Sequence, residues 1–143
     1  MGTVRDLLKT KGQATWRATP NSTVYEALRQ MAEKNVGALL VMEGDRVVGI
    51  FSERDYARKV MLKGKFSAET FVREVMTENL ITIAPHQSIE ECMELMTNKH
   101  IRHLPVMEDG KLIGVISIGD VVKSIIEDQK ATITHLEGYI IGR

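Results

Sequence analysis

The sequence contains one unit twice, and this duplication limits the fold more than any other feature. Residues 20–60 align with residues 85–125 at a constant offset of 65, without a gap, and eleven of the 41 aligned positions are identical. The identical pairs are Pro20/Pro85, Glu26/Glu91, Met31/Met96, Lys34/Lys99, Leu39/Leu104, Val41/Val106, Met42/Met107, Glu43/Glu108, Gly49/Gly114, Ser52/Ser117 and Asp55/Asp120. A repeat of this length predicts a fold built from two similar supersecondary units.

A shorter lead-in segment also recurs ahead of each copy. Val4–Leu8 corresponds to Val72–Met76 at an offset of 68. The first copy therefore carries three extra residues between its lead-in and its proline, and we place them in a loop near Lys11-Gly12-Gln13.

Hydrophobic spacing and turn residues predict the same order of elements in each copy. Apolar residues at helical spacing indicate one amphipathic helix per copy, with Thr23 and Ser88 as N-caps. Short apolar runs predict strands at 37–42 and 47–51, and again at 104–107 and 112–116, with Asp109-Gly110 typical of a hairpin turn. A second helix is expected at about 53–63 and 118–128, and a short strand at 15–18 and 80–83. Each copy is thus predicted to be a β-α-β-β-α unit of an α+β protein.

The composition is that of an ordinary folded domain and excludes several classes of protein. The 19 Lys and Arg residues balance the 19 Asp and Glu residues, so no overall positive field favours nucleic acid or an anionic membrane. The longest apolar run, residues 37–42, is far shorter than the roughly 18 residues of a membrane span. The N-terminus lacks the apolar stretch of a signal peptide, and the single Cys92 cannot form an internal disulfide. We expect a cytoplasmic protein without a metal site.

Identical residues of the two copies concentrate where the third strand meets the second helix. Residues 49–55 and 114–120 share the pattern Gly-x-x-Ser-x-x-Asp. One interpretation is structural, because a Ser N-cap followed three residues later by an acid is a variant of the capping box. The other is functional, because a helix N-terminus favours phosphate and an Asp one turn into the helix can accept two hydrogen bonds from a ribose diol. The pattern itself leaves both interpretations open.

Together with the Ile-Arg-His-Leu-Pro-Val segment at 101–106, the doubled pattern resembles a tandem pair of CBS domains, the module named after cystathionine beta-synthase. The resemblance covers nearly the whole chain and implies two repeats, at 1–68 and 69–143, packed through their sheets with pseudo-two-fold symmetry. Members of the family bind adenosine-containing nucleotides such as AMP, ADP, ATP, S-adenosylmethionine or a dinucleotide such as NAD in clefts between the paired repeats. They mostly sense ligands, so we expect a regulatory module rather than an enzyme, with no catalytic residues and no catalytic cofactor.

The resemblance also implies which residues contact the nucleotide. It places ribose on Asp55 and Asp120, with Ser52 and Ser117 near phosphate. The further contacts that it implies in the second copy are Arg102 and His103 for phosphate and Thr82 and Ile83 for the base.

The first copy departs from this pattern. Gly37 and Ala38 occupy the positions of the Arg-His pair, so that cleft loses two polar groups. Arg54, with Arg58 one turn further along, could partly replace them. We therefore expect two unequal sites.

Other interpretations stay open at this point. His103 also fits a strand histidine bonded to a neighbouring carbonyl. A chain with vestigial, empty clefts would be a structural oligomerisation domain. An enzyme acting on nucleotides would need a general base near phosphate, for which only His103 is a candidate. An effector protein is a further partner that the resemblance implies.

The second helices carry more apolar side chains than two sheets can cover, which predicts a homodimer. These residues are Tyr56, Ala57, Val60 and Met61 in the first copy and Val121, Val122, Ile125 and Ile126 in the second. Residues of the C-terminal tail that add to this interface are Ile133, Leu136, Tyr139, Ile140 and Ile141.

Overall fold

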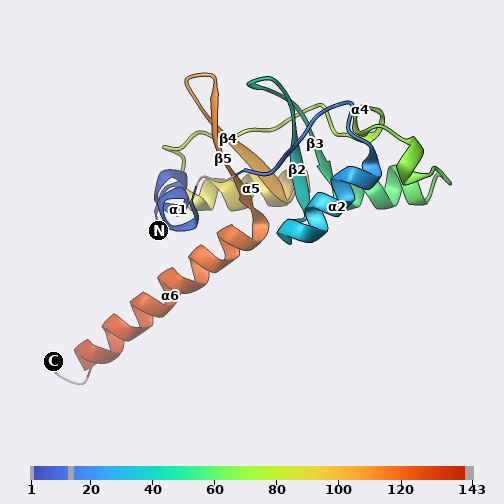
Figure 1. Ribbon diagram of the computed structural model, residues 1–143. Coiled ribbons are helices and arrows are strands. Elements are labelled where there is room, and N and C mark those ends of the chain that lie inside the picture. Colours follow the sequence, from blue (N-terminus) through green and yellow to red (C-terminus); the bar gives the residue numbers. More distant parts are fainter. Residues whose placement is uncertain (1, 13–14, 141–143) are drawn as a thin grey trace. The chain divides into compact units, whose positions relative to one another are not determined.

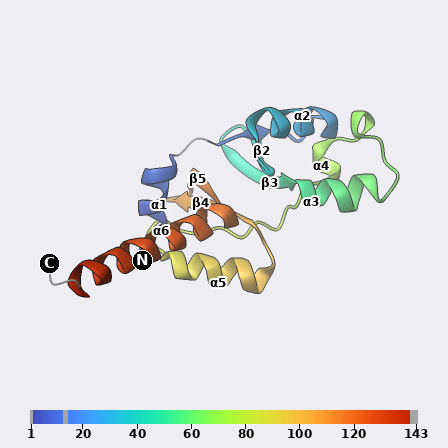
Figure 2. The ribbon, with the colours of Figure 1, turned by 90° about the horizontal axis from the view of Figure 1, so that it is seen from below.

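The computed structural model describes residues 2–12 and 15–140, and the chain divides into two compact units (Figures 1 and 2). The repeat-1 unit is residues 14–81, and the repeat-2 unit is residues 1–13 together with 82–143. Each unit combines helices with a small sheet, so the α+β class is confirmed.

The repeat-1 unit is built on a three-stranded sheet. Its elements are β1 (Arg17–Ala18), α2 (Val24–Lys34), β2 (Ala38–Glu43), β3 (Arg46–Ser52), α3 (Glu53–Asp55), the π-helix η1 (Tyr56–Met61), the 3₁₀-helix η2 (Ser67–Glu69) and α4 (Val72–Val75). The strand order is β1-β2-β3, with β1 parallel and β3 antiparallel to β2. Side chains of α2, the sheet, η1 and α4 form one core, which includes Val24, Met31, Val41, Phe51, Val60 and Val72.

The repeat-2 unit is built on a two-stranded antiparallel sheet. Its elements are α1 (Val4–Lys11), α5 (Ile89–Lys99), β4 (His103–Glu108), β5 (Lys111–Ser117) and α6 (Ile118–Ile140). Figure 2 shows α1, α5 and the first half of α6 gathered around this hairpin. Leu8, Ile83, Ile89, Leu104 and Ile116 are at most 2% exposed and form its core.

The local signals of the sequence are confirmed. Thr23 and Ser88 cap α2 and α5 by accepting hydrogen bonds from the backbone N–H of Glu26 and Glu91, each at 3.1 Å. The β4–β5 turn places Asp109 and Gly110 at φ angles of 51° and 76°, which is the left-handed conformation that a tight hairpin turn requires.

Three predicted boundaries are wrong. α6 continues to Ile140 rather than ending near residue 128, because no proline interrupts the sequence there. The expected strand at 80–83 is only an isolated bridge between Ile83 and Val106. The second helix of the first copy ends at Met61, as a π-helical turn, rather than at residue 63. In the part of the chain that the structure describes, no helix is apolar over a length that would cross a bilayer.

Each lead-in segment packs on the other copy, so the units differ from the expected division at residue 68. In α1, the N–H groups of Val4 and Arg5 donate to the carbonyls of Gln87 and Pro85, both at 2.9 Å. In α4, Val72 and Arg73 repeat this pattern with the carbonyls of Ser22 and Pro20, at 2.8 and 3.0 Å. The helix N-termini thereby gain partners for backbone groups that would otherwise be unsatisfied, which fixes where each lead-in docks. Lys11, expected in a loop, is the last residue of α1.

The glycine shared by both copies makes room for the exchanged lead-in. A Cβ at Gly114 would lie 2.8 Å from Cδ2 of Leu8 on α1. A Cβ at Gly49 would lie 2.7 Å from Sδ of Met76 and 3.0 Å from the backbone carbonyl of Thr77. The identity of these glycines therefore has a packing explanation.

Candidate functional site

The repeated Gly-x-x-Ser-x-x-Asp pattern forms the same strand-to-helix corner in both units. The N–H of Ser52 donates to Oδ2 of Asp55 at 3.0 Å, and the N–H of Asp55 donates to Oγ of Ser52 at 3.2 Å. Ser117 and Asp120 make the equivalent bonds at 2.8 and 3.1 Å. The capping-box interpretation is therefore confirmed at both corners, and any ligand role must be additional to it.

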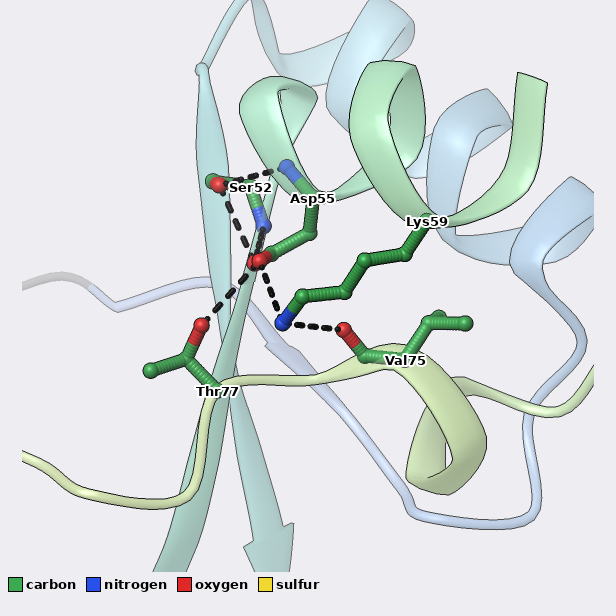
Figure 3. A network of polar contacts seen from close by, with 5 residues as sticks. All are labelled: Ser52, Asp55, Lys59, Val75 and Thr77. Atoms are coloured by element: carbon green, nitrogen blue, oxygen red, sulfur yellow. Dashed lines mark hydrogen bonds and ion pairs between the residues drawn. The ribbon is translucent and has the colours of Figure 1, made fainter. Parts of the chain in front are cut away.

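The repeat-1 corner encloses its carboxylate, as Figure 3 shows. Asp55 is only 7% exposed. Its Oδ2 accepts from Ser52, while its Oδ1 lies 3.0 Å from Oγ1 of Thr77 and 3.0 Å from Nζ of Lys59. Lys59 also donates to the carbonyl of Val75 at 3.2 Å. Both oxygens of Asp55 are thus engaged within the unit.

The repeat-2 corner has a more open carboxylate with a different cation. Nζ of Lys11 lies 2.6 Å from Oδ2 of Asp120 and also donates to the carbonyl of Val115. The two charged side chains are 32% and 25% exposed. Partial burial pushes the pKa of Asp120 upward, but hydrogen bonds from Lys11 and Ser117 and the Lys11 charge outweigh it, so that the pKa is lowered. Asp120 is therefore ionised at neutral pH.

His103 is the first residue of β4 and Arg102 directly precedes it, and both lie beside this corner. The carbonyl of Arg102 accepts from the N–H of Ile118, the first residue of α6, at 2.8 Å, and His103 pairs with Ser117 in the sheet register. Burial lowers the pKa of His103, Lys11 and Arg102 lower it further, and Asp120 opposes them. His103 is consequently a neutral hydrogen-bonding group at pH 7, and the cation paired with Asp120 is Lys11.

The other predicted contacts are dispersed. Ile83 is 2% exposed and its backbone bonds to Pro105 and Met107, so its side chain belongs to the core while Thr82 is exposed. Arg54 and Arg58 are exposed on α3 and η1.

Among the described residues, a cavity can be defined in each unit. The cavity of the repeat-2 unit, between α1 and α6, has a volume of about 440 Å³ and is lined by Asp6, Thr10, Lys11, Asp120, Lys123 and Glu127, among others. The cavity of the repeat-1 unit has a volume of about 470 Å³ and a more apolar lining that includes Leu28, Met31, Val36, Gly37 and Tyr56. Asp120 thus borders a cavity, whereas Asp55 does not contribute to the lining of the repeat-1 cavity.

The partners of the two carboxylates were missed by the sequence analysis. Lys59 follows Asp55 by four residues, a spacing that favours ion pairs on a helix and could have indicated this contact. Thr77 and Lys11 give no local signal. Their only indication is that each closely follows a copy of the lead-in segment.

The chain is similar to CBS-domain proteins along most of its length. The sequence profile described as CBS domain matches residues 17–62 and 72–127. The chain is 40% identical to the CBS domain-containing protein CBSX3, mitochondrial, of Arabidopsis thaliana, covering 98% of this chain and 72% of the relative. It is 31% identical to the CBS domain-containing protein YhcV of Bacillus subtilis, covering 92% and 91% of the two chains.

Solved structures agree with the sequence matches. A protein with CBS domains from Burkholderia ambifaria, described as a signal-transduction protein, superposes with a TM-score of 0.86 at 52% identity, covering 89% of this chain and 96% of the other. The CBS domain pair of protein MJ0100, solved with 5′-methylthioadenosine and S-adenosyl-L-methionine, superposes with a TM-score of 0.76 at 24% identity, covering 86% and 98%. With two matched segments that span more than two thirds of its length, the chain belongs to the CBS domain family and carries two such domains in tandem.

Proposed function

We propose that this chain is a regulatory module that binds an adenosine-containing nucleotide, such as AMP, ADP, ATP or NAD, at the repeat-2 corner. The observation that carries the proposal is Asp120, an ionised and partly exposed carboxylate that borders a cavity of about 440 Å³ beside a lysine. A carboxylate accepts hydrogen bonds from both hydroxyls of a ribose, whereas a cation and a helix N-terminus favour phosphate.

Each proposed contact with the nucleotide in this corner is assigned to a named residue. Asp120 binds the ribose hydroxyls, and the Ser117 corner at the start of α6 faces the phosphate. Arg102 supplies a planar donor group suited to phosphate oxygens, and His103 supplies a neutral hydrogen-bonding group. Thr82 borders the base. Ile83 is buried, and its backbone is bonded to Pro105 and Met107, so its contribution is to hold Thr82 in position.

The repeat-1 corner is proposed as the weaker site. Asp55 is enclosed by Thr77 and Lys59, so a ribose would have to displace bonds already made inside the unit. Ser52 is committed to the same cap, which leaves Arg54 and Arg58 as the exposed groups that could meet a phosphate there.

The solved complex of protein MJ0100 supports the adenosine part of the proposal. Both of its ligands, 5′-methylthioadenosine and S-adenosyl-L-methionine, contain adenosine. At 24% identity this likeness concerns the fold, so the ligand of the present chain rests on its own residues.

We further propose that the module acts as a homodimer and transmits occupancy through the dimer or to an effector protein. Val60 and Val121 are at most 1% exposed and do not reach such an interface. Met61, Val122 and Ile126 are 60%, 40% and 45% exposed and are available to it.

Denaturing the purified protein and identifying released small molecules by mass spectrometry tests the ligand directly. In parallel, we expect AMP, ADP, ATP or NAD to raise the melting temperature, because a ligand that binds only the folded state stabilises it by about 2.7 kcal/mol at 100 times Kd. Cytidine monophosphate is the matched control, because it keeps ribose and phosphate and changes only the base. No released nucleotide and no shift with any of these ligands would contradict the proposal.

That negative outcome would favour a second candidate, a structural oligomerisation domain with empty clefts. One observation supports this candidate, namely that the capping boxes alone account for the identity of both Ser-x-x-Asp patterns.

A further inference from the structure

The outer face of α6 carries a heptad stripe, defined here as Val122, Ile126, Gln129, Ile133 and Leu136. The steps along it alternate between four and three residues, which is the period of a helix that packs against another helix. The four apolar members are 40%, 45%, 54% and 51% exposed. Between 40% and 54% of the surface of each of these residues is therefore available for contact.

The C-terminal half of α6 lacks support inside its own unit. The helix spans Ile118–Ile140, and its C-terminal half extends beyond α1 and α5 in both ribbon views (Figures 1 and 2). Val121, on its inner face, is fully buried, so the first turns are anchored while the stripe continues outward. A helical segment without packing is only marginally stable in water, which favours a partner along the stripe.

The chemistry of the stripe and its flanks selects the kind of partner. A membrane-surface helix needs a basic polar face, but the flanks of this stripe combine Lys123 and Lys130 with Glu127 and Glu137. The heptad spacing of the stripe over two repeats instead matches a second helix of the same period. Helix α6 of a second copy of the chain has the same period, because its sequence is identical.

Charge complementarity then selects the orientation. We propose that α6 pairs with α6 of a second copy in an antiparallel helix pair along the heptad stripe. In this register Ile126 packs against Leu136 of the second copy, and Gln129 packs against Ile133. Lys123 faces Glu137 of the second copy, and the two-fold symmetry produces this ion pair twice.

The parallel alternative lacks this complementarity. In a parallel pair, the residues that flank the stripe would place Ile125 of one copy beside Lys130 of the other, and Thr132 beside Glu137. Neither contact joins opposite charges. The antiparallel register has one unfavourable contact, because Lys130 of one copy approaches Lys130 of the second copy near the two-fold axis. A lysine relieves this by extending its ammonium into solvent.

The proposal specifies the interface of the homodimer in the proposed function. Lys123 also lines the repeat-2 cavity, whereas Ile133 does not, so Ile133 tests the interface apart from nucleotide binding. Sedimentation of the full chain at micromolar concentration should give a dimer. Ile133→Glu should raise the dimer dissociation constant by at least about 100-fold, because two unpaired carboxylates would be buried. Thr134→Glu, at an α6 position outside the stripe and its flanking residues, is the matched control and should leave the dimer intact.

Charge reversal tests the orientation. Lys123→Glu alone and Glu137→Lys alone should each weaken the dimer by about tenfold, whereas the double variant should restore it. Two singly substituted cysteine variants add a covalent readout: mixing Gln129→Cys with Ile133→Cys should give a crosslinked heterodimer, and Gln129→Cys alone should not crosslink. Burial raises the pKa of Cys92 to about 11, so this native thiol does not compete.

Several results would overturn the proposal. A monomeric parent chain would exclude the interface. A dimer that survives Ile133→Glu would place dimerisation on other residues. Efficient crosslinking of Gln129→Cys to itself would establish the parallel orientation. Nucleotide release remains a separate measurement, so a failure of this interface and a failure of the proposed ligand site are distinguishable.

Discussion

Substituting Glu at each of the two motif aspartates separates the capping role from the ligand role. Both side chains cap a helix through Oδ2, but their surroundings differ. Asp55 is 7% exposed and held by Thr77 and Lys59. The Asp120 side chain is 25% exposed and its cation, Lys11, is 32% exposed. One added methylene extends the carboxylate by roughly 1.5 Å, and the two sites should respond in opposite ways.

Stability should fall mainly at the repeat-1 corner. Asp55→Glu inserts a methylene into a closed site, where overpacking costs about 1–3 kcal/mol. Asp120→Glu should cost less than about 1 kcal/mol, because the partly exposed Lys11 can follow the carboxylate and Glu at this helix position also serves a capping box. Because about 1 kcal/mol corresponds to about 2–4 °C for a chain of this size, thermal unfolding without ligand resolves the difference.

Affinity should fall mainly at the repeat-2 corner. A carboxylate displaced by about 1.5 Å can no longer accept from both ribose hydroxyls, so Asp120→Glu should weaken nucleotide binding about tenfold or more, which is at least about 1.4 kcal/mol. Asp120→Asn should also bind poorly, because the amide keeps one acceptor and loses the charge. Asp55→Glu should leave this binding unchanged. Titration calorimetry with AMP and ATP measures both.

Two results would refute the reasoning. If Asp120→Glu binds AMP and ATP like the parent, the motif at this corner is a cap only and the ligand site lies elsewhere. If Asp55→Glu unfolds at the same temperature as the parent, the enclosed geometry of that corner does not restrict the side chain as argued.

Three further predictions follow from the same geometry. Arg102→Ala should weaken nucleotide binding at the repeat-2 site by about 1.5–3 kcal/mol, the range of a charge-assisted hydrogen bond, and titration calorimetry showing equal losses at two sites would contradict this assignment. Folding lowers the pKa of Asp120, so its ionised side chain stabilises the folded state above the pKa of an unfolded Asp, about 3.9. This stabilisation is lost as the pH falls through the folded pKa. The difference in urea stability between the parent and Asp120→Asn should therefore narrow below about pH 4. Gly49→Ala should cost about 1–3 kcal/mol and more than Gly114→Ala, because its Cβ would meet a backbone carbonyl at 3.0 Å, whereas the nearest neighbour of the Gly114 Cβ is the end of the Leu8 side chain; equal urea midpoints would contradict this order.

Features encoded by neighbouring residues could be predicted from the sequence. Thr23 and Ser88 cap helices because their hydroxyls reach an N–H three residues ahead. Asp109-Gly110 forms the hairpin because both residues tolerate a positive φ. The capping box at each corner is equally local, and its Ser and Asp were predicted with the correct geometry.

Features that depend on distant residues could not be predicted in this way. The partner of Asp120 is Lys11, which lies 109 positions earlier in the chain, and the repeat alignment does not indicate which copy a lead-in joins. The expected strand at 80–83 also failed for a long-range reason, since a ladder needs a paired neighbour and only Ile83 finds one.

The two corners of the duplicated chain differ in how exposed their carboxylates are, and this difference bears on the proposed ligand binding. Gly, Ser and Asp of the motif are identical in both copies and serve the same local purposes, the close approach of a lead-in and the cap of a helix. What differs lies outside the motif. In the repeat-1 unit the carboxylate is closed off by Thr77 and by Lys59 of its own helical segment, whereas in the repeat-2 unit a lysine on a separate helix leaves it beside a cavity. A motif shared by both copies can therefore keep both corners folded, while residues outside it determine how exposed each carboxylate is: Lys59 and Thr77 at Asp55, and Lys11 at Asp120.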